Sequence, residues 1–376
     1  MRNFELETFF SRWEFSAKYH MTASDVQSTS IRELLSLANV TPDAFLDTHL
    51  GYTETWGAPD LRRAIAGTYE NIDDAQVLCF AGAEEGVYAA MRVLLSPQDH
   101  AVVVVPNYQA AETVPLDICA VTGVPIHASN DWHLDVTDVK RALRPNTRVV
   151  SVCFPNNPTG ATMPRDDFAE LIELCRQHGI YLFSDEVYRL LELDESKRLP
   201  AAAEAYEKGL SLSVMSKAYG FPGLRIGWIA CQDTAVLQRL ERYKHYLSIC
   251  NSAPSERLAT IALSVGEKIL KRNRALLTSN LESLSAFFAR HSGLFEWRAP
   301  DGGCVAFPRY LGADGVETFC SELVEQSGVL LLPASVYRSE LMATPADRFR
   351  IGFGRAGIDE GLAQLDRFLD QRPLSP

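Results

Sequence analysis

Short, continuous apolar runs alternate with amphipathic helical segments between about residue 57 and residue 230. Apolar positions at helical spacing predict helices at residues 58–69, 84–95 and 165–178. Continuous apolar runs predict strands at residues 101–105, 148–154, 180–184, 210–215 and 225–230. Such runs are typical of strands buried on both faces, so we expect an α/β fold with a large, mainly parallel central sheet covered by helices.

Past residue 233 the pattern becomes helical over residues 234–249 and 255–291, a length that bridges one domain to the next. A smaller α+β unit is expected after it, with strands at 303–308 and 349–352 and helices at 317–326 and 360–370. The prediction is therefore an N-terminal arm of residues 1–45 that contributes to the small domain and to the site, a large domain of residues 46–270 and a small domain of residues 271–376.

The composition and net charge make some classes of binding partner unfavourable. The 376 residues carry 36 Lys and Arg against 48 Asp and Glu, a net charge of −12, which disfavours nucleic acid and anionic membranes as partners. No apolar run approaches the ~18–20 residues of a membrane helix, and the acidic N-terminus does not resemble a signal peptide. Eight cysteines without a CxxC pair and eight histidines without paired-ligand spacing predict reduced thiols in the cytoplasm and no metal site.

Polar clusters follow the predicted strands or open the next helix, which is where parallel α/β sheets place their ligands. In chain order these clusters are Ala81-Gly82-Ala83-Glu84-Glu85, Pro106-Asn107-Tyr108, Asn156-Asn157-Pro158-Thr159-Gly160, Ser184-Asp185-Glu186-Val187-Tyr188, Ser216-Lys217-Ala218-Tyr219-Gly220 and Gly223-Leu224-Arg225-Ile226-Gly227. Their order and position indicate a single ligand site at one edge of the sheet.

The first and last clusters suit a phosphate. A helix beginning at Gly82–Glu84 offers unpaired N–H groups, and Arg225 offers a bidentate cation. Ser216, from the fifth cluster, can add a hydroxyl. The sequence therefore predicts an anion site there.

The remaining clusters suit an aromatic ring bound by a lysine. Tyr108 can stack on a ring, Asn157 and Tyr188 can contact a ring hydroxyl, and Asp185 can keep a pyridine nitrogen protonated. A protonated pyridine is a strong electron sink for chemistry at an amino acid's α carbon. Lys217, with a pKa lowered by burial and neighbouring cations, supplies an amine for a Schiff base.

This ordered set resembles fold-type I pyridoxal-5′-phosphate enzymes, specifically the class I/II aminotransferases, and extends from Tyr52 to Gly352. The resemblance implies an aspartate-aminotransferase-like fold, with Lys217 as the Schiff-base lysine, Asp185 on the pyridine nitrogen, and Asn157 and Tyr188 at the ring oxygen. It also implies that Tyr108 stacks on the ring, that Gly82, Ala83, Glu84, Ser216 and Arg225 bind the phosphate, and that Arg350 and Asn157 bind substrate. A tyrosine matching Tyr52 reaches the neighbouring subunit's phosphate in this family, so a homodimer is expected.

Two departures from the family pattern concern the substrate. Val214 stands where many members carry Ser or Thr, and the arm reads His20 to Gln27 in place of the usual Gly-x-Pro segment. The arm is more similar to the capreomycidine-synthase-like branch, whose members process arginine-derived amino acids. Taken singly, the arm residues Glu14, His20, Ser24 and Asp25 are expected to pack the arm rather than bind ligand.

The sequence also contains a glycine-rich motif, Gly352-x-Gly354-x-x-Gly357, which fits the dinucleotide-binding pattern. Only 19 residues follow it, too few for the helix, strand and acidic residue that such a site requires. We therefore reject a dinucleotide site.

The resulting hypothesis is a pyridoxal-phosphate enzyme that transfers the amino group of an α-amino acid to a keto acid. The alternative is elimination, cyclisation or oxidation of an arginine-derived amino acid on the same residues. A sensor-type regulator would need a DNA-binding domain for which the chain has no room. An inactive relative would most plausibly have lost Lys217 or Asp185, and both are present.

Overall fold

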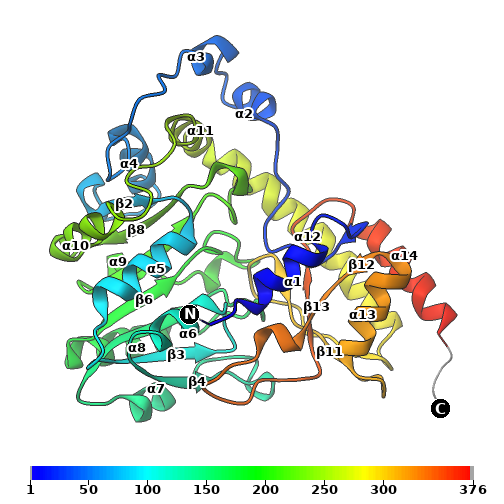
Figure 1. The fold of residues 1–376 in the computed structure, drawn as a ribbon. Helices are drawn as coiled ribbons and strands as arrows, with labels where there is room; N and C mark the ends of the chain where they lie inside the picture. The colour runs from blue at the N-terminus through cyan, green and yellow to red at the C-terminus, as the bar shows by residue number, and fades with distance from the viewer. Residues whose placement is uncertain (1, 373–376) are drawn as a thin grey trace.

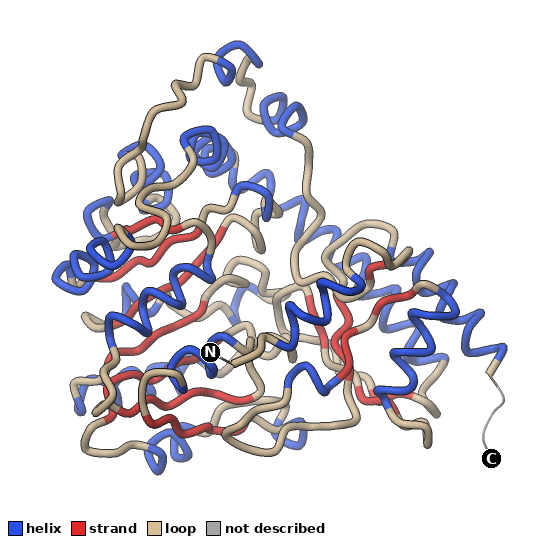
Figure 2. Tube along the Cα trace, in the orientation of Figure 1, coloured by secondary structure: helices blue, strands red, loops and turns tan. Residues whose placement is uncertain are grey.

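The computed structural model describes residues 2–372 and is built around a seven-stranded sheet in the order β2-β8-β7-β6-β5-β3-β4 (Figures 1 and 2). The strands are β2 (Val77–Phe80), β3 (His100–Val105), β4 (Ala120–Pro125), β5 (Thr147–Cys153), β6 (Tyr181–Asp185), β7 (Gly209–Val214) and β8 (Gly227–Cys231). Five adjacent strands from β7 to β4 run parallel, and β8 is antiparallel to both of its neighbours. The prediction of a mainly parallel sheet is confirmed.

The five predicted strands are present as β3, β5, β6, β7 and β8, and the two edge strands β2 and β4 were not predicted. β2 has only four residues, and β4 contains Gly123 and Pro125, which read as turn residues in the sequence. β8 begins at Gly227 rather than at residue 225 because Arg225 has a left-handed backbone, with φ of 54°.

Helices cover the sheet on both sides, as the amphipathic pattern predicted (Figure 1). Those of the large sheet region are α4 (Pro59–Ala66), α5 (Ala83–Leu94), α6 (Ala110–Leu116), α7 (Val136–Ala142), α8 (Arg165–His178), α9 (Ala202–Ala205), α10 (Thr234–Lys244) and α11 (Ala253–Ser264). The bounds of α8 coincide with the prediction. On α5, Gly86 lies against the Leu212 side chain of β7, where a Cβ atom would collide, so this helix approaches the sheet closely.

A second unit follows, with α12 (Gly266–Arg290) running from the large sheet region into it (Figure 1). Its other elements are β9 (Phe295–Glu296), β10 (Val305–Ala306), β11 (Arg309–Tyr310), α13 (Val316–Ser327), β12 (Val329–Leu330), β13 (Leu332–Pro333), β14 (Phe349–Gly352) and α14 (Ile358–Gln371). The single helix predicted over 255–291 is wrong, because Val265 leaves the helical region (φ −120°, ψ 22°) and separates α11 from α12.

The N-terminal arm contains α1 (Glu5–Trp13), β1 (Tyr19–His20), α2 (Ile31–Leu37) and α3 (Pro42–Leu46). β1 pairs in parallel with β12, with Tyr19 opposite Val329. α3 lies at the top of Figure 1 and buries none of its residues, whereas α2 packs against α11 and buries Leu34 and Leu35. α2 begins at a capping box formed by Ser30 and Glu33.

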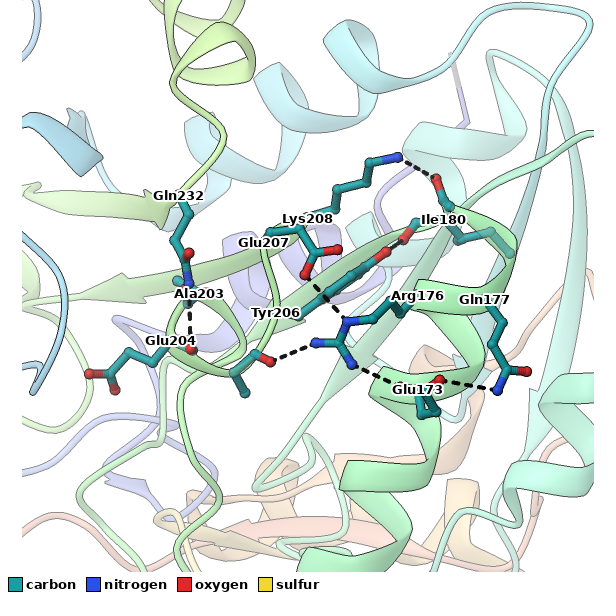
Figure 3. A network of polar contacts seen from close by, with 12 residues as sticks. Glu173, Arg176, Gln177, Ile180, Ala203, Glu204, Tyr206, Glu207, Lys208 and Gln232 are labelled. Carbon is teal, nitrogen blue, oxygen red and sulfur yellow. Dashed lines mark hydrogen bonds and ion pairs between the residues drawn. The ribbon is translucent and has the colours of Figure 1, made fainter.

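A polar network connects the end of α8 to the turn that precedes β7 (Figure 3). The Tyr206 hydroxyl donates to the Ile180 carbonyl at 2.8 Å, and Lys208 Nζ donates to the Gly179 carbonyl at 3.1 Å. The Arg176 guanidinium donates to the Ala205 carbonyl at 3.1 Å. These bonds fix the start of β6 beside β7, and in this register Asp185, the last residue of β6, lies opposite Leu212 of β7.

Within residues 2–372 no helix is both long enough and apolar enough to cross a bilayer.

Candidate active site

A cavity of about 810 Å³ opens at the carboxyl ends of the parallel strands, between the large sheet, α1 and β14. Ten of the twelve residues predicted from the sequence line it: Ala83, Glu84, Tyr108, Asn157, Asp185, Tyr188, Ser216, Lys217, Arg225 and Arg350. Gly82 lies directly behind the wall, against Arg225. Tyr52 is 94% exposed and lies outside this cavity.

Asp185 and Lys217 come from the ends of neighbouring strands and interact electrostatically across the cavity. Burial raises the pKa of Asp185 to about 6, opposed by the Val187 N–H and by the charge of Lys217. Burial lowers the pKa of Lys217, which increases the fraction of neutral, nucleophilic amine at a given pH. The Lys217 Nζ donates to Ser24 Oγ at 2.9 Å.

The start of α5 forms a cradle with Arg225. Gly82 is the N-cap with φ of 100°, and a Cβ atom there would collide with the Arg225 guanidinium. Gly227 is packed just as closely against the Gly82 and Ala83 backbone. Free helix N–H groups, the Ser216 hydroxyl and the Arg225 cation therefore converge where only glycine leaves room.

Glu84 stands in the first turn of α5 on the cavity wall. Burial raises the pKa of its carboxyl to about 7, with further contributions from Glu7 and Asp185. A carboxyl that is protonated near neutral pH can donate a hydrogen bond beside an anion instead of repelling it.

Three side chains predicted to contact an aromatic ligand ring make hydrogen bonds with neighbouring residues. The Tyr108 hydroxyl donates to Glu7 Oε1 at 3.2 Å, and the Tyr188 hydroxyl donates to the Ser24 carbonyl at 3.1 Å. Asn157 Oδ1 accepts a hydrogen bond from the Tyr337 hydroxyl at 3.2 Å.

Arg350 lies on β14 and is almost fully buried, with 1% of its surface exposed. Its Nη2 donates to the Thr22 carbonyl at 2.7 Å, and its Nη1 donates to Asn157 Oδ1 at 3.3 Å. The guanidinium lies 5.7 Å from the centre of the Phe10 ring. It is a preoriented cation facing the cavity, suited to a carboxylate.

Sequence reasoning missed how much of the cavity wall the arm supplies. Glu14, His20, Ser24 and Asp25, interpreted above as packing groups, all line the cavity, together with Glu7, Phe10 and Phe15. Asp25 also has a packing role, because its carboxylate pairs with Arg355 at 2.9 and 3.0 Å. The departure of residues 20–27 from the usual family pattern was the available signal.

Burial changes the titration of two of these arm residues. It lowers the pKa of His20 to about 4, assisted by Arg355 and Arg350, so the imidazole is neutral at physiological pH. It raises the pKa of Glu14, and the nearby Glu7 carboxylate adds to this shift.

Comparisons with known proteins agree on one family. Residues 33–370 match the family described as aminotransferase class I and II. Capreomycidine synthase of Streptomyces vinaceus is 29% identical over 374 residues, covering 97% of this chain and 93% of that protein. The arginine–pyruvate transaminase AruH of Pseudomonas aeruginosa is 29% identical over 311 residues, covering 78% of this chain and 77% of that protein.

Solved structures give the same result. A pyridoxal-phosphate-dependent aminotransferase from Streptococcus suis superposes with a TM-score of 0.93 at 29% identity, covering 100% of this chain and 99% of that one. The pyridoxal-phosphate-dependent cyclase OrfR superposes with a TM-score of 0.90 at 26% identity, covering 99% of this chain and 98% of that one.

Proposed function

The chain belongs to the class I and II aminotransferase family, whose cofactor is pyridoxal phosphate, and from this premise we propose that it transfers the amino group of an α-amino acid to a keto acid. The observation that carries the proposal is the pairing of Lys217 and Asp185 in one cavity, each with a pKa shifted by burial. Strongly perturbed titratable groups that face one another in a cleft are typical of catalytic sites.

The residues present fit the cofactor. The cradle of Gly82, Ala83, Ser216 and Arg225 offers a cation and hydrogen-bond donors to a phosphate, and an added Cβ at Gly82 would collide with the Arg225 guanidinium that forms part of it. Asp185 matches a pyridine nitrogen, and Lys217 matches an aldehyde. When bound, pyridoxal phosphate supplies an aldehyde that bonds to amines and a ring that accepts the electron pair left at the α carbon.

The protein's own groups bind, orient and move protons. Arg350 binds the substrate α-carboxylate and thereby presents the α carbon to Lys217. Lys217 Nζ, whose pKa burial lowers, would accept the α proton and deliver it to the carbon that had been the cofactor's aldehyde, instead of returning it to the α carbon. Asp185 keeps its carboxylate beside the ring nitrogen so that this nitrogen stays protonated.

A second candidate, the elimination or cyclisation of an amino acid with a cationic side chain, is favoured by the charge of α1. Glu7 and Glu14, seven residues and two helical turns apart, both line the cavity, with Phe10 and Phe15 beside them. Carboxylates and aromatic faces are the groups that bind a guanidinium or ammonium. Two relatives are named for arginine chemistry or capreomycidine synthesis, which supports this substrate class for the present chain.

Visible absorbance and product analysis with single amino acids test both candidates. Arginine, ornithine, glutamate and leucine are added to purified protein, followed by pyruvate. Transamination predicts loss of the cofactor's ~420 nm band, release of a keto acid and recovery of the band with pyruvate. An arginine-derived product that keeps its amine would favour elimination or cyclisation. Absence of any cofactor band after reconstitution would overturn the proposal.

We further propose a homodimer in which Tyr52 completes the partner's site. Tyr52 is outside the chain's own cavity, and Leu46, Leu50 and Tyr246 are large apolar side chains that are also exposed. Subunits carrying Tyr52→Phe are mixed with subunits carrying Lys217→Ala, and sedimentation gives the assembly state. Cofactor affinity in the Tyr52→Phe homodimer that equals the parent's would contradict a shared site.

A further inference from the structure

Ser24 lies on the arm segment that crosses the cavity and makes the hydrogen bond to Lys217 described above. We propose that Ser24 is a positioning residue for Lys217, holding Nζ in the orientation from which it exchanges a proton with the substrate α carbon. This inference rests on the proposed function, because it assigns Lys217 that proton transfer.

The segment that carries Ser24 is fixed on both sides. The Ser24 carbonyl accepts the Tyr188 hydroxyl at 3.1 Å, and the Asp25 carboxylate is bound by Arg355 through two hydrogen bonds. The Thr22 carbonyl, two residues before Ser24, is bound by Arg350. Ser24 is therefore held between the groups proposed for the cofactor ring and for the substrate carboxylate.

The glycine motif rejected as a dinucleotide site explains the close fit of this segment. A Cβ on Gly352 would collide with the Ala23 carbonyl, and a Cβ on Gly354 would collide with the Asp25 carbonyl. The two glycines let the arm backbone lie directly on the strand end, and the Gln27 N–H donates to the Gly354 carbonyl at 2.8 Å. A hydroxyl on a segment held this rigidly is preorganised to orient Lys217.

A serine hydroxyl suits this task because it both accepts and donates. It accepts an N–H from protonated Lys217 and can donate to the lone pair of the neutral amine, so it contacts Nζ in both states. The charged or titratable groups that also interact with Lys217 are Glu14, Asp25, Cys153, Asp185, Cys304 and Arg350. Ser24 is the side chain to which Nζ donates a hydrogen bond among the described residues.

The test compares Ser24→Ala and Ser24→Thr with Ser28→Ala, a control at an exposed serine of the same arm. The first readout needs no cofactor: in cofactor-free protein, the rate at which an amine reagent labels Lys217 is followed against pH by mass spectrometry. Loss of the hydroxyl removes an acceptor that favours the ammonium, so Ser24→Ala lowers the labelling midpoint by about 0.5–1 pH unit. Ser24→Thr and Ser28→Ala keep the parent's midpoint.

The second readout is the division between kcat and KM with an α-deuterated substrate. Ser24→Ala lowers kcat about 10–100-fold, leaves KM within about 3-fold and increases the isotope effect, whereas Ser24→Thr restores kcat. A Ser24→Ala protein with the parent's labelling midpoint and kcat would overturn the inference. So would equal losses in the alanine and threonine variants with lowered melting temperatures, which indicate a structural role. Turnover that survives Lys217→Ala would instead overturn the proposed function.

Discussion

Arg350 Nη1 donates to Asn157 Oδ1 at 3.3 Å, joining β14 to the loop after β5 across 193 positions of sequence. The Tyr337 hydroxyl donates to the same oxygen at 3.2 Å. One amide oxygen therefore orients the cation proposed for the substrate carboxylate and couples it to the loop proposed for the cofactor ring.

This coupling predicts that Arg350→Lys raises KM for amino acids about 30–300-fold, because lysine cannot reproduce the two-pronged guanidinium contact. Tyr337→Phe, which removes only one bond to Asn157, raises KM by less than about 10-fold. Steady-state kinetics are compared between an amino acid and the amine that lacks its carboxylate. An equal loss on both substrates would contradict the carboxylate role of Arg350.

Lys217→Ala is expected to reduce turnover by at least about 1,000-fold and to abolish the mass increase produced by borohydride reduction of the bound cofactor. Lys208→Ala is the matched control, because that lysine only donates to the Gly179 carbonyl in the network of Figure 3. Retained borohydride labelling in Lys217→Ala would identify a different lysine as the attachment point.

Gly82→Ala is expected to weaken cofactor binding at least about 10-fold, because the new methyl group displaces the Arg225 guanidinium from the cradle. Gly315→Ala is the matched control: Gly315 has a similar positive φ of 79°, with no atom near its added Cβ. Both variants carry backbone strain, and only Gly82→Ala meets Arg225. Cofactor titration that gives equal affinities for the two variants would show that the cradle is not the phosphate site.

Glu7→Gln and Glu14→Gln are each expected to raise KM for arginine about 3–10-fold while leaving KM for a neutral amino acid of similar length unchanged. Glu5→Gln serves as the control, since Glu5 is on the same helix but not on the cavity wall. The effect should shrink with added salt. Unchanged selectivity in both variants would remove the support for a cationic substrate.

His100 predicts a pH dependence of stability. Its ring lies in the sheet between Thr147 Oγ1 at 2.8 Å and Thr122 Oγ1 at 2.9 Å, and burial, with Arg144, lowers its pKa to about 4. The unfolded chain binds this proton below pH ~6.5, so the folded state loses stability between pH ~6.5 and ~4. At pH 5 the loss is about 1–2 kcal/mol. Urea unfolding at pH 5 and 7.5 should show a smaller difference in His100→Gln than in the parent.

The part of the site that sequence reasoning located lies at the ends of buried strands. Asp185 and Lys217 each follow an uninterrupted apolar run, and parallel pairing forces such ends to one edge of the sheet. The arm carried a weaker signal, because Ser24 is held in the cavity by contacts with residues far away in the sequence, Tyr188 at 164 positions and Lys217 at 193. The break at Val265 was missed for a different reason: one residue outside helical geometry leaves the apolar spacing of α11 and α12 unaltered.

The pairing of Tyr19 with Val329 has a consequence for how the protein is made. The ribosome synthesises all seven strands of the large sheet, and Lys217, well before it reaches β12. Until β12 has been made, β1 of the arm has no strand to pair with. Until then the lysine faces an open groove lacking the wall that Ser24 and α1 provide.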